Sequence, residues 1–268
     1  MKIACLEHLL PGARLQEKWE FAVRAGYDAI ELRGRGAYAF RQRLPELRRA
    51  VRDGVVLPTV SVDMRHFFGA FDRELRRDAI DQVKSQLSVM ADIGGRGVVT
   101  PAWRGMFSLQ LPPFRPPRSA EGDREVLCEG LTELGRHAEK EGVRLFLEPL
   151  NRYEDHMVNR LDKAVDLVRT VGTAGLCLSG LGVAVDTFHL NIEEDDPALA
   201  LRGAGRLVGH VLVADSNGFQ PGAGHLEWSS VLSALSCVGY GGFLTLRSRL
   251  RGDEASAVAS VPAFLRSR

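Results

Sequence analysis

The sequence of 268 residues predicts a single domain with the (β/α)8 fold of a TIM barrel. Short apolar runs of strand length alternate with longer, charged amphipathic segments, and this alternation is typical of strand–helix units around a parallel sheet. The alternation repeats often enough for eight units of roughly 33 residues, as a closed barrel requires. Glycines separate most helical segments from the next apolar run. We therefore expect one domain over residues 1–268.

The predicted strands are apolar runs that begin near Ile3, Ala29, Leu57, Val98, Leu145, Val183, Val208 and Phe243. The glycines that precede strands follow amphipathic segments, at Gly26, Gly54, Gly94, Gly142, Gly172, Gly205 and Gly239. A residue without a Cβ suits the left-handed turn that ends many helices, so these glycines predict helix-to-strand turns. Their regular spacing favours a closed barrel over an open, doubly wound sheet.

Charge and composition exclude several classes of function. The chain has 35 basic and 34 acidic residues, a formal net charge of +1, so no overall field attracts it to nucleic acid or to an anionic membrane. It has no apolar run as long as a transmembrane helix needs and no signal-peptide pattern at its start. The four cysteines lack CxxC spacing. We expect a cytoplasmic protein that acts on a small molecule.

Polar residues at the carboxyl ends of the strands are the candidates for a functional site, because the rest of each barrel strand packs the core. The fifth strand ends at Glu148 and is followed by the run Pro-Leu-Asn-Arg-Tyr-Glu at 149–154. The sixth strand ends with Asp-Thr-Phe-His at 186–189. The seventh ends at Asp215, and its loop continues Pro-Gly-Ala-Gly-His-Leu-Glu-Trp at 221–228. A carboxylate at the end of a buried strand needs a charged or hydrogen-bonding partner.

These three segments resemble the sugar phosphate isomerase/epimerase superfamily, the xylose-isomerase-like TIM barrels that include ketose 3-epimerases such as tagatose and psicose epimerase. The resemblance spans nearly the whole chain. It implies one divalent metal held by a Glu, an Asp, a His and a second Glu from the fifth to the eighth strand. Glu148 matches the first metal-binding glutamate and base, and Asp186 matches the aspartate ligand. Glu154 and His189 match groups that contact the substrate.

The chain departs from this family at two of the four metal ligands. Leu212 stands where the resemblance implies the histidine, and Arg247 where it implies the second glutamate. His210 is two residues early, which places it one layer, roughly 7 Å, deeper in the barrel. Because two carboxylates hold a divalent ion poorly and a guanidinium repels it, we predict no cofactor and no tight metal. Weak residual metal binding through Glu148 and Asp186 stays open.

We predict instead that Arg247 lies between Glu148 and Asp186 and neutralises both carboxylates. Glu148 is then the catalytic base, although the pairing weakens it, and Arg247 or His189 stabilises an oxyanion. The simpler alternative for His189 is a hydrogen bond to the backbone. A further departure puts Gly218 where the resemblance implies a substrate-contacting arginine. The catalytic residues are thus predicted to be Glu148, His189 and Arg247.

The residues predicted to bind substrate are Trp103, Arg152, Glu154, Asp186, His210, Asp215 and His225. Trp103 opens a long proline-rich loop that suits a lid, a subunit contact or a plain surface loop. The less specific alternatives are that His210 is a core histidine and that His225 braces its glycine turn. We expect residues 193–196 to be solvated at the start of a helix, with Pro197 in its first turn.

Three functions remain. The first is an enzyme that moves a proton next to the carbonyl of a sugar or polyhydroxy compound, by epimerisation, isomerisation, dehydration or a ring rearrangement. The second is a non-catalytic relative that binds a sugar-like ligand or a protein partner, with Glu148 and Asp186 as structural ion-pair partners of Arg247. The third, an abasic-site endonuclease, needs several zinc ligands and a basic face that the chain lacks. The resemblance also implies a homodimer or homotetramer.

Overall fold

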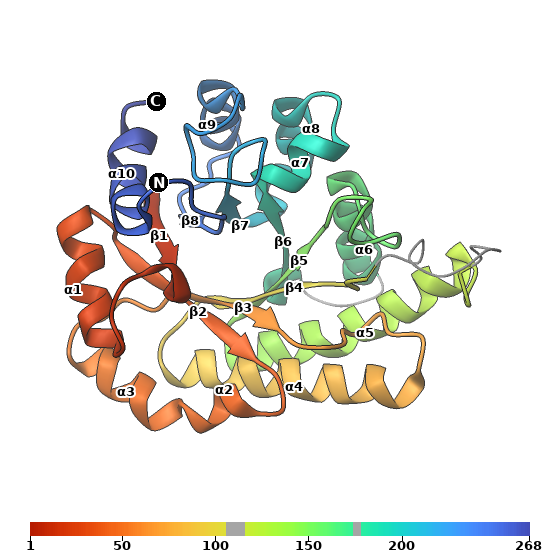
Figure 1. Cartoon of the computed structure of the whole chain (residues 1–268). Helices are drawn as coiled ribbons and strands as arrows, with labels where there is room; N and C mark the ends of the chain where they lie inside the picture. Colours follow the sequence, from red (N-terminus) through yellow and green to blue (C-terminus); the bar gives the residue numbers. More distant parts are fainter. Residues whose placement is uncertain (106–115, 174–177) are drawn as a thin grey trace.

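Eight strands form the centre of the molecule, a computed structural model that describes residues 1–105, 116–173 and 178–268. The strands are β1 (Lys2–Leu6), β2 (Ala29–Arg35), β3 (Thr59–Asp63), β4 (Gly97–Pro101), β5 (Arg144–Glu148), β6 (Leu181–Asp186), β7 (Val208–Val213) and β8 (Phe243–Leu246). Each pairs in parallel with the next, and β8 pairs with β1, so the sheet closes (Figure 1). Every strand begins within two residues of its predicted start, which confirms the (β/α)8 fold.

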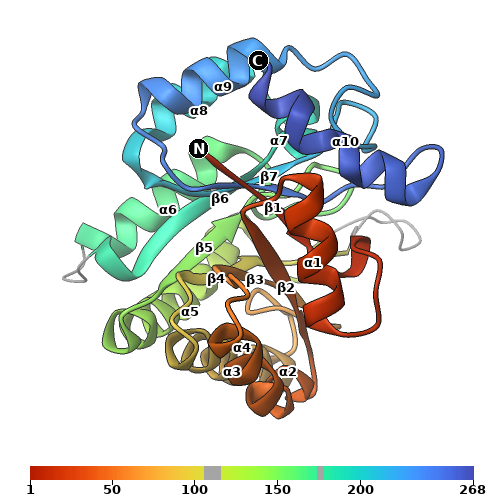
Figure 2. The ribbon, with the colours of Figure 1, turned by 90° about the vertical axis from the view of Figure 1, so that its left-hand side faces the viewer.

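Helices surround the barrel on all sides. The helices in the described ranges are α1 (Leu15–Ala25), α2 (Ala39–Gln42), α3 (Leu44–Arg52), α4 (Arg73–Asp92), α5 (Ala120–Glu141), α6 (Leu161–Thr173), α7 (Thr187–Glu193), α8 (Pro197–Ala204), α9 (Trp228–Cys237) and α10 (Glu254–Arg266), with one-turn 3-10 helices η1 (Glu7–Leu9), η3 (Leu178–Gly180) and η4 (Gly205–Leu207). Figure 2 shows α2 to α5 on one side of the barrel and α8 to α10 on the other. The largest apolar cluster packs between strands and helices. None of the helices described is long and apolar enough to cross a membrane.

Local sequence sets the ends of several helices. Asp72, Ser119 and Asp253 each accept hydrogen bonds from backbone N–H groups in the first turn of α4, α5 and α10. Gly142 ends α5 in the left-handed region, with φ at 71°. Gly172, which was predicted to be a turn residue, instead lies within α6. Caps and left-handed glycines therefore set helix ends at several of the predicted boundaries.

The interior of the barrel contains a small apolar layer around Phe146. Val99, Ala184 and Leu212 pack with this ring in one buried cluster. Gly209 makes room for it, since a Cβ on that residue would lie 2.3 Å from the Phe146 ring. A glycine at the start of β7 is therefore a packing requirement of the large side chain beside it.

A buried contact between a histidine and a carboxylate lies beside this layer. Nε2 of His210 is 2.6 Å from Oε2 of Glu31, and both side chains are almost completely buried. Thr59 and Ser61 also donate hydrogen bonds to the Glu31 carboxylate. Burial alone raises the pKa of Glu31, but His210 and the two hydroxyl groups lower it to about 2. His210 therefore lies in the core, in agreement with the less specific interpretation of this histidine.

Replacing Glu31 with Gln removes the buried carboxylate that His210 and two hydroxyl groups contact. We expect the free energy of unfolding to fall by about 3–5 kcal/mol, because the histidine stays buried without its partner. Urea denaturation at neutral pH measures this loss. In a double-mutant cycle with His210→Gln, the double variant should lose less than the sum of the two single losses. Simple additivity would contradict an energetically coupled pair.

Candidate active site

A cavity of about 460 Å³ opens at the carboxyl end of the barrel, where all the strands end. Glu148 ends β5, Asp186 ends β6, and Arg247 directly follows β8. His189 in α7 and Glu154 in the loop after β5 also line the cavity. Because parallel strands of a closed barrel deliver their carboxyl ends to one face, side chains far apart in sequence meet here.

Arg247 lies between the two buried carboxylates, as the sequence predicts. Its Nη1 is 3.0 Å from Oε2 of Glu148, and its Nη2 contacts Oε1 of the same residue. Nη2 also donates to Oδ2 of Asp186 at 2.7 Å, and Nε reaches the same oxygen at 3.3 Å. Burial alone lowers the pKa of Arg247, but the charges and hydrogen bonds of Glu148 and Asp186 raise it above its ordinary value. The guanidinium is thus a permanent cation between two carboxylates.

The register of the sheet places Leu212 and His210 at different depths. Leu212 pairs with Asp186, so an apolar side chain stands beside the aspartate where the resemblance implies a histidine. His210 pairs with Ala184, one layer deeper, and contacts Glu31. It does not line the cavity in the described part of the chain. The sequence predicts that His210 contacts substrate, but the structure places this residue one layer deeper in the barrel than Leu212, outside the described cavity lining. Alternate residues of a strand face the same side at successive depths, which explains this position.

Hydrogen bonds from Asn151 determine which nitrogen of His189 carries a proton. Nδ1 of His189 accepts from the backbone N–H of Asn151 at 3.2 Å, and it is 2.8 Å from the side-chain amide nitrogen. A backbone N–H can only donate, so Nδ1 is unprotonated and the neutral ring carries its proton on Nε2. The predicted backbone hydrogen bond of His189 is therefore present. The same ring offers an N–H donor at the edge of the cavity.

Three side chains form a candidate metal cluster. Glu148, Asp186 and His189 each offer a ligand atom within 4.8 Å of the other two, so together they could hold a metal ion. Sequence reasoning considered only the two carboxylates and missed His189, which α7 brings into reach. The donors fit a cation poorly, because both carboxylates already bind Arg247. A metal-binding histidine usually donates through its other ring nitrogen, whereas Nδ1 of His189 accepts.

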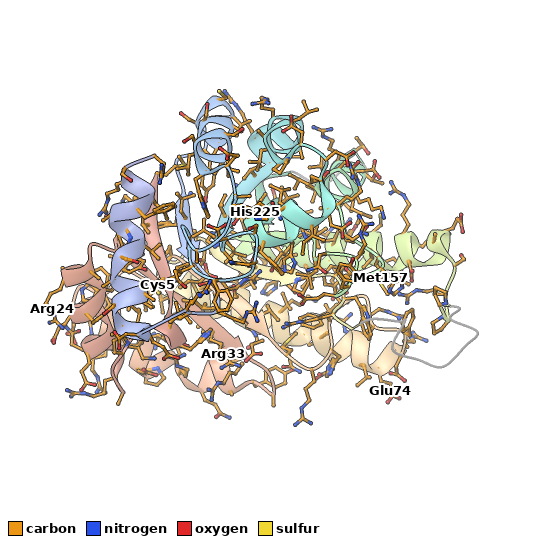
Figure 3. The ribbon with its side chains drawn as sticks, turned by 45° about the horizontal axis from the view of Figure 1, so that its top comes forward. Cys5, Arg24, Arg33, Glu74, Met157 and His225 are labelled. Carbon is orange, nitrogen blue, oxygen red and sulfur yellow. The ribbon has the colours of Figure 1, made fainter. Side chains whose placement is uncertain are left out.

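Two predicted substrate contacts organise the loop after β7 instead. The Asp215 carboxylate accepts hydrogen bonds from the Trp228 indole at 3.0 Å and from the backbone N–H groups of residues 216, 222 and 226. Burial raises the pKa of Asp215, but these donors lower it below its ordinary value. Nδ1 of His225 is 3.1 Å from the Ser216 hydroxyl, and neither Asp215 nor His225 lines the cavity among the described residues. Figure 3 labels His225 on this loop.

Arg152 turns away from the cavity toward a buried glutamate. Its Nε is 2.9 Å from Oε1 of Glu193, and its backbone N–H donates to the same oxygen. Glu193 and Glu194 are buried, and Glu194 accepts from the backbone of Leu161. The expectation that residues 193–196 are solvated is therefore wrong for these two glutamates, because the loop after β5 folds over them. Pro197 does lie in the first turn of α8, as predicted.

Trp103 also lies outside the cavity lining. Its ring packs against Phe71 at 5.4 Å between centroids, and its indole donates to the backbone oxygen of Gly105. Most of the predicted proline-rich loop, 106–115, lies outside the described residues. The next residue, Arg104, does line the cavity and is 3.2 Å from Glu154.

Arg249 is a cavity residue that the sequence analysis missed. Its Nη2 donates to the backbone oxygen of Asn217 at 2.8 Å, and its guanidinium lies 4.5 Å from the Phe219 ring centroid. A Cβ on Gly218 would lie 3.5 Å from the same Nη2. The resemblance implies an arginine at position 218, and here the guanidinium of Arg249, from the segment after β8, lies near Gly218 instead. Its spacing of two residues from Arg247 was the available signal, since alternate residues of an extended segment share a face.

Comparison with known proteins assigns the family. The profile of the family described as "Xylose isomerase-like TIM barrel" matches residues 19–268. The chain belongs to this family, which confirms the resemblance inferred from its strand-end segments. The family shares a barrel architecture, and individual activities depend on the residues at the strand ends.

Several sugar epimerases are similar to the chain. The 3-dehydro-D-guloside 4-epimerase of Escherichia coli strain K12 is 33% identical over 269 residues, which cover 100% of both chains. A D-psicose 3-epimerase of Enterocloster bolteae is 32% identical over 231 residues, 81% of this chain and 71% of the other. The crystal structure of 3-keto-D-glucoside 4-epimerase from E. coli in its apo form has a TM-score of 0.91 at 32% identity, covering 100% of both chains.

A buried carboxyl lies in the loop that carries Asn151 and Glu154. Asp155 accepts hydrogen bonds from the backbone N–H groups of Met157 at 2.8 Å and Val158 at 3.2 Å. Met157 of this loop is labelled in Figure 3. Burial raises the pKa of Asp155 from 3.8 to about 7, against the lowering effect of these two bonds. The carboxyl is therefore neutral in the fold at pH values where the unfolded chain is ionised.

Between pH 3.8 and about 7 the folded state binds more protons at Asp155 than the unfolded state, so this residue makes stability fall as pH rises through that window. Asp155→Asn has no group that titrates in this range, so the fall should disappear, while its single amide oxygen keeps only one of the two backbone bonds and lowers stability equally at every pH. We expect the variant to gain roughly 4 kcal/mol over the native chain between pH 4 and pH 8, because each pKa unit is worth about 1.4 kcal/mol. Denaturation across this range, with the exposed Asp195→Asn as control, measures the effect. Parallel pH profiles for the native chain and Asp155→Asn would contradict it.

Proposed function

We propose that the protein is a sugar isomerase/epimerase-type enzyme that removes and returns a proton on the carbon next to a carbonyl, with Glu148 as the base. The position of Glu148 carries this proposal. Its buried carboxylate ends β5 inside the cavity, beside His189 and Arg247. A carboxylate at the end of a barrel strand, next to two donors, suits proton abstraction with stabilisation of the resulting oxyanion.

The proposed substrate is a keto sugar, and specifically a keto-glycoside. The relative that matches over the full length of both chains is named as a 4-epimerase of 3-dehydro-D-gulosides. The ketose 3-epimerases match over a smaller share of this chain or of their own length. The cavity volume of about 460 Å³ and its mixture of carboxylates, arginines and Phe188 suit a polyhydroxylated ring of this size.

The proposed chemistry gives Glu148, Arg247 and His189 one role each. Glu148 takes the proton from the carbon, and the electron pair of the C–H bond moves into the carbonyl to form an enediolate. Arg247 offsets the growing negative charge, and Nε2–H of His189 donates to a substrate oxygen. The proton then returns to carbon, so the reaction needs no oxidant. Return of the proton by Glu148 to the neighbouring carbon gives an isomer, whereas an epimer forms when a solvent water molecule delivers a proton to the opposite face and Glu148 passes its own proton to solvent.

We further propose that this reaction proceeds without the divalent metal of the family. Three observations support it: Arg247 occupies both carboxylates, Leu212 stands beside Asp186, and Nδ1 of His189 accepts a hydrogen bond from the backbone of Asn151. A guanidinium supplies charge neutralisation in planar geometry but cannot be a Lewis acid with open coordination positions. The oxyanion must therefore be held by hydrogen bonds.

A non-catalytic, ligand-binding role is the second candidate. It is favoured by the same ion pair, because the oxygens of the Glu148 carboxylate are already engaged by the Arg247 guanidinium, as in a structural ion pair. Other expectations remain proposals of ours: a single domain over residues 1–268, a cytoplasmic location and a homo-oligomer.

Hydrogen exchange into the substrate tests the catalytic proposal. We expect the native chain to incorporate deuterium from D2O into a 3-keto-D-glucoside next to its carbonyl, and we expect Glu148→Gln to lose at least about 100-fold of this rate. Mass spectrometry and proton NMR follow the label, and product analysis distinguishes an epimer from an isomer. The exposed Glu125→Gln is the matched control. Binding of the keto-glycoside without any exchange would favour the second candidate.

Metal titration tests metal independence separately. Arg247→Gln leaves Glu148 and Asp186 buried without a cation, and we expect it to lose about 3–5 kcal/mol of stability. Added Mn²⁺ should raise the melting temperature of this variant and leave that of the native chain unchanged. Exchange by the native chain should also persist in EDTA. One equivalent of tightly bound metal in the native chain, removed by Glu148→Gln, would overturn this part of the proposal.

A further inference from the structure

A second cavity lies at the opposite end of the barrel from the candidate active site. It has a volume of about 580 Å³ and is formed where the strands begin. Three arginines line it: Arg96 precedes β4, Arg144 opens β5, and Arg206 precedes β7. The rest of its lining is apolar residues, a cysteine, a tyrosine and glycines, with no carboxylate among the described residues. The cavity is therefore strongly and uniformly basic in a chain of nearly balanced charge.

Arg144 is held in a fixed position within this cavity. Its Nη2 donates to the backbone oxygen of Leu181 at 2.7 Å, and its guanidinium lies 5.3 Å from the Phe146 ring centroid. A Cβ on Gly182 would lie 2.7 Å from Nη2, so a glycine is needed to seat the guanidinium. Its Nε is buried without a hydrogen-bond partner in the described structure. A buried, unpaired N–H of a cation costs stability unless an acceptor binds it.

The three arginines carry charge that nothing in the described chain neutralises. Each lacks a salt bridge with any described carboxylate, in contrast to Arg247 at the other end. Burial lowers the pKa of Arg144, and the nearby charge of Arg96 lowers it further. The Arg96 guanidinium also lies 5.8 Å from the Phe243 ring centroid. Clustered like charges with low-dielectric walls attract anions.

Glycines leave the backbone open around this basic cluster. Gly209, Gly239, Gly241 and Gly242 all line the cavity, with open space beside Gly239 and Gly241, whereas Phe146 and Tyr240 fill the space beside Gly209 and Gly242. At Gly239 and Gly241 a ligand can approach the backbone closely, as in phosphate-binding loops. The three arginines provide planar donor groups that match phosphoryl oxygens. The volume exceeds the space that a phosphoryl group alone needs.

We propose that this cavity binds a small phosphorylated metabolite, with its phosphoryl oxygens on Arg96, Arg144 and Arg206. The site is separate from the reaction, because β5 carries Arg144 at its start and Glu148 at its end. Phosphate recognition through planar guanidinium groups explains why the cavity needs several arginines and no carboxylate. The proposal stands independently of whether the cavity at the carboxyl end catalyses proton transfer.

Calorimetric titration with pyrophosphate tests the proposal on the full chain. We expect binding to the native chain, and at least about tenfold weaker binding to the double variant Arg96→Gln/Arg206→Gln, because the variant loses the charge-assisted hydrogen bonds of two guanidinium groups. Both residues are exposed, so the variant keeps the core that Arg144 packs against. The matched control is Arg52→Gln/Arg202→Gln, which removes two exposed arginines outside the cavity and should bind as the native chain does.

Three outcomes would overturn the proposal. The first is no binding of pyrophosphate at about 10 mM, which is weaker than a built site gives. The second is an equal loss in the control variant, which would mean attraction to net charge alone. The third is a loss in Arg249→Gln, since Arg249 lines the cavity at the carboxyl end and its loss would place the anion there. Deuterium exchange into the keto-glycoside, measured on the same variants, reports separately on the proposed reaction.

Discussion

Two buried carboxylates at one end of the barrel require a positive charge between them, and the candidate site is organised around the one that Arg247 supplies. Closure of the barrel brings the buried carboxylates of Glu148 and Asp186 together, although their negative charges repel each other. A guanidinium satisfies both through several directional hydrogen bonds, whereas a metal ion accepts ligands from many directions. The remaining cavity residues are therefore arranged for hydrogen bonding, with His189 presenting an N–H group.

The two ends of the barrel differ in the charges that they carry. At the carboxyl end, charges of both signs meet and compensate each other in the Arg247 cluster. At the amino end, charges of one sign gather around glycines, and the Phe146 layer and the Glu31–His210 pair lie between the two ends. A single strand such as β5 therefore contributes one residue to each end, Arg144 at its start and Glu148 at its end.

Strand periodicity and the family resemblance together predicted the parts of the site that the sheet determines. Alternation places His210 one layer deeper than Leu212, and the resemblance puts Arg247 where a metal-binding glutamate is implied, close to Glu148; both expectations agree with the structure. The alternation of side chains along a strand does not determine the conformation of the loops that follow it. For that reason Arg152 turns to a buried glutamate and Asp215 holds its own loop, while Arg104 and Arg249 reach the cavity unpredicted. The protonated nitrogen of His189 depends on a single backbone contact that no sequence pattern encodes.

The covalent attachment of Arg247 to the chain has a consequence for how the protein responds to its surroundings. A bound metal exchanges with the medium, so its occupancy varies with supply, with competing ions and with chelating metabolites. The guanidinium is placed when the chain folds and keeps its charge at every physiological pH. In the metal-free site that we propose, the charge balance of the carboxylates is therefore independent of metal availability, and every folded copy of the protein carries the same Arg247 cluster.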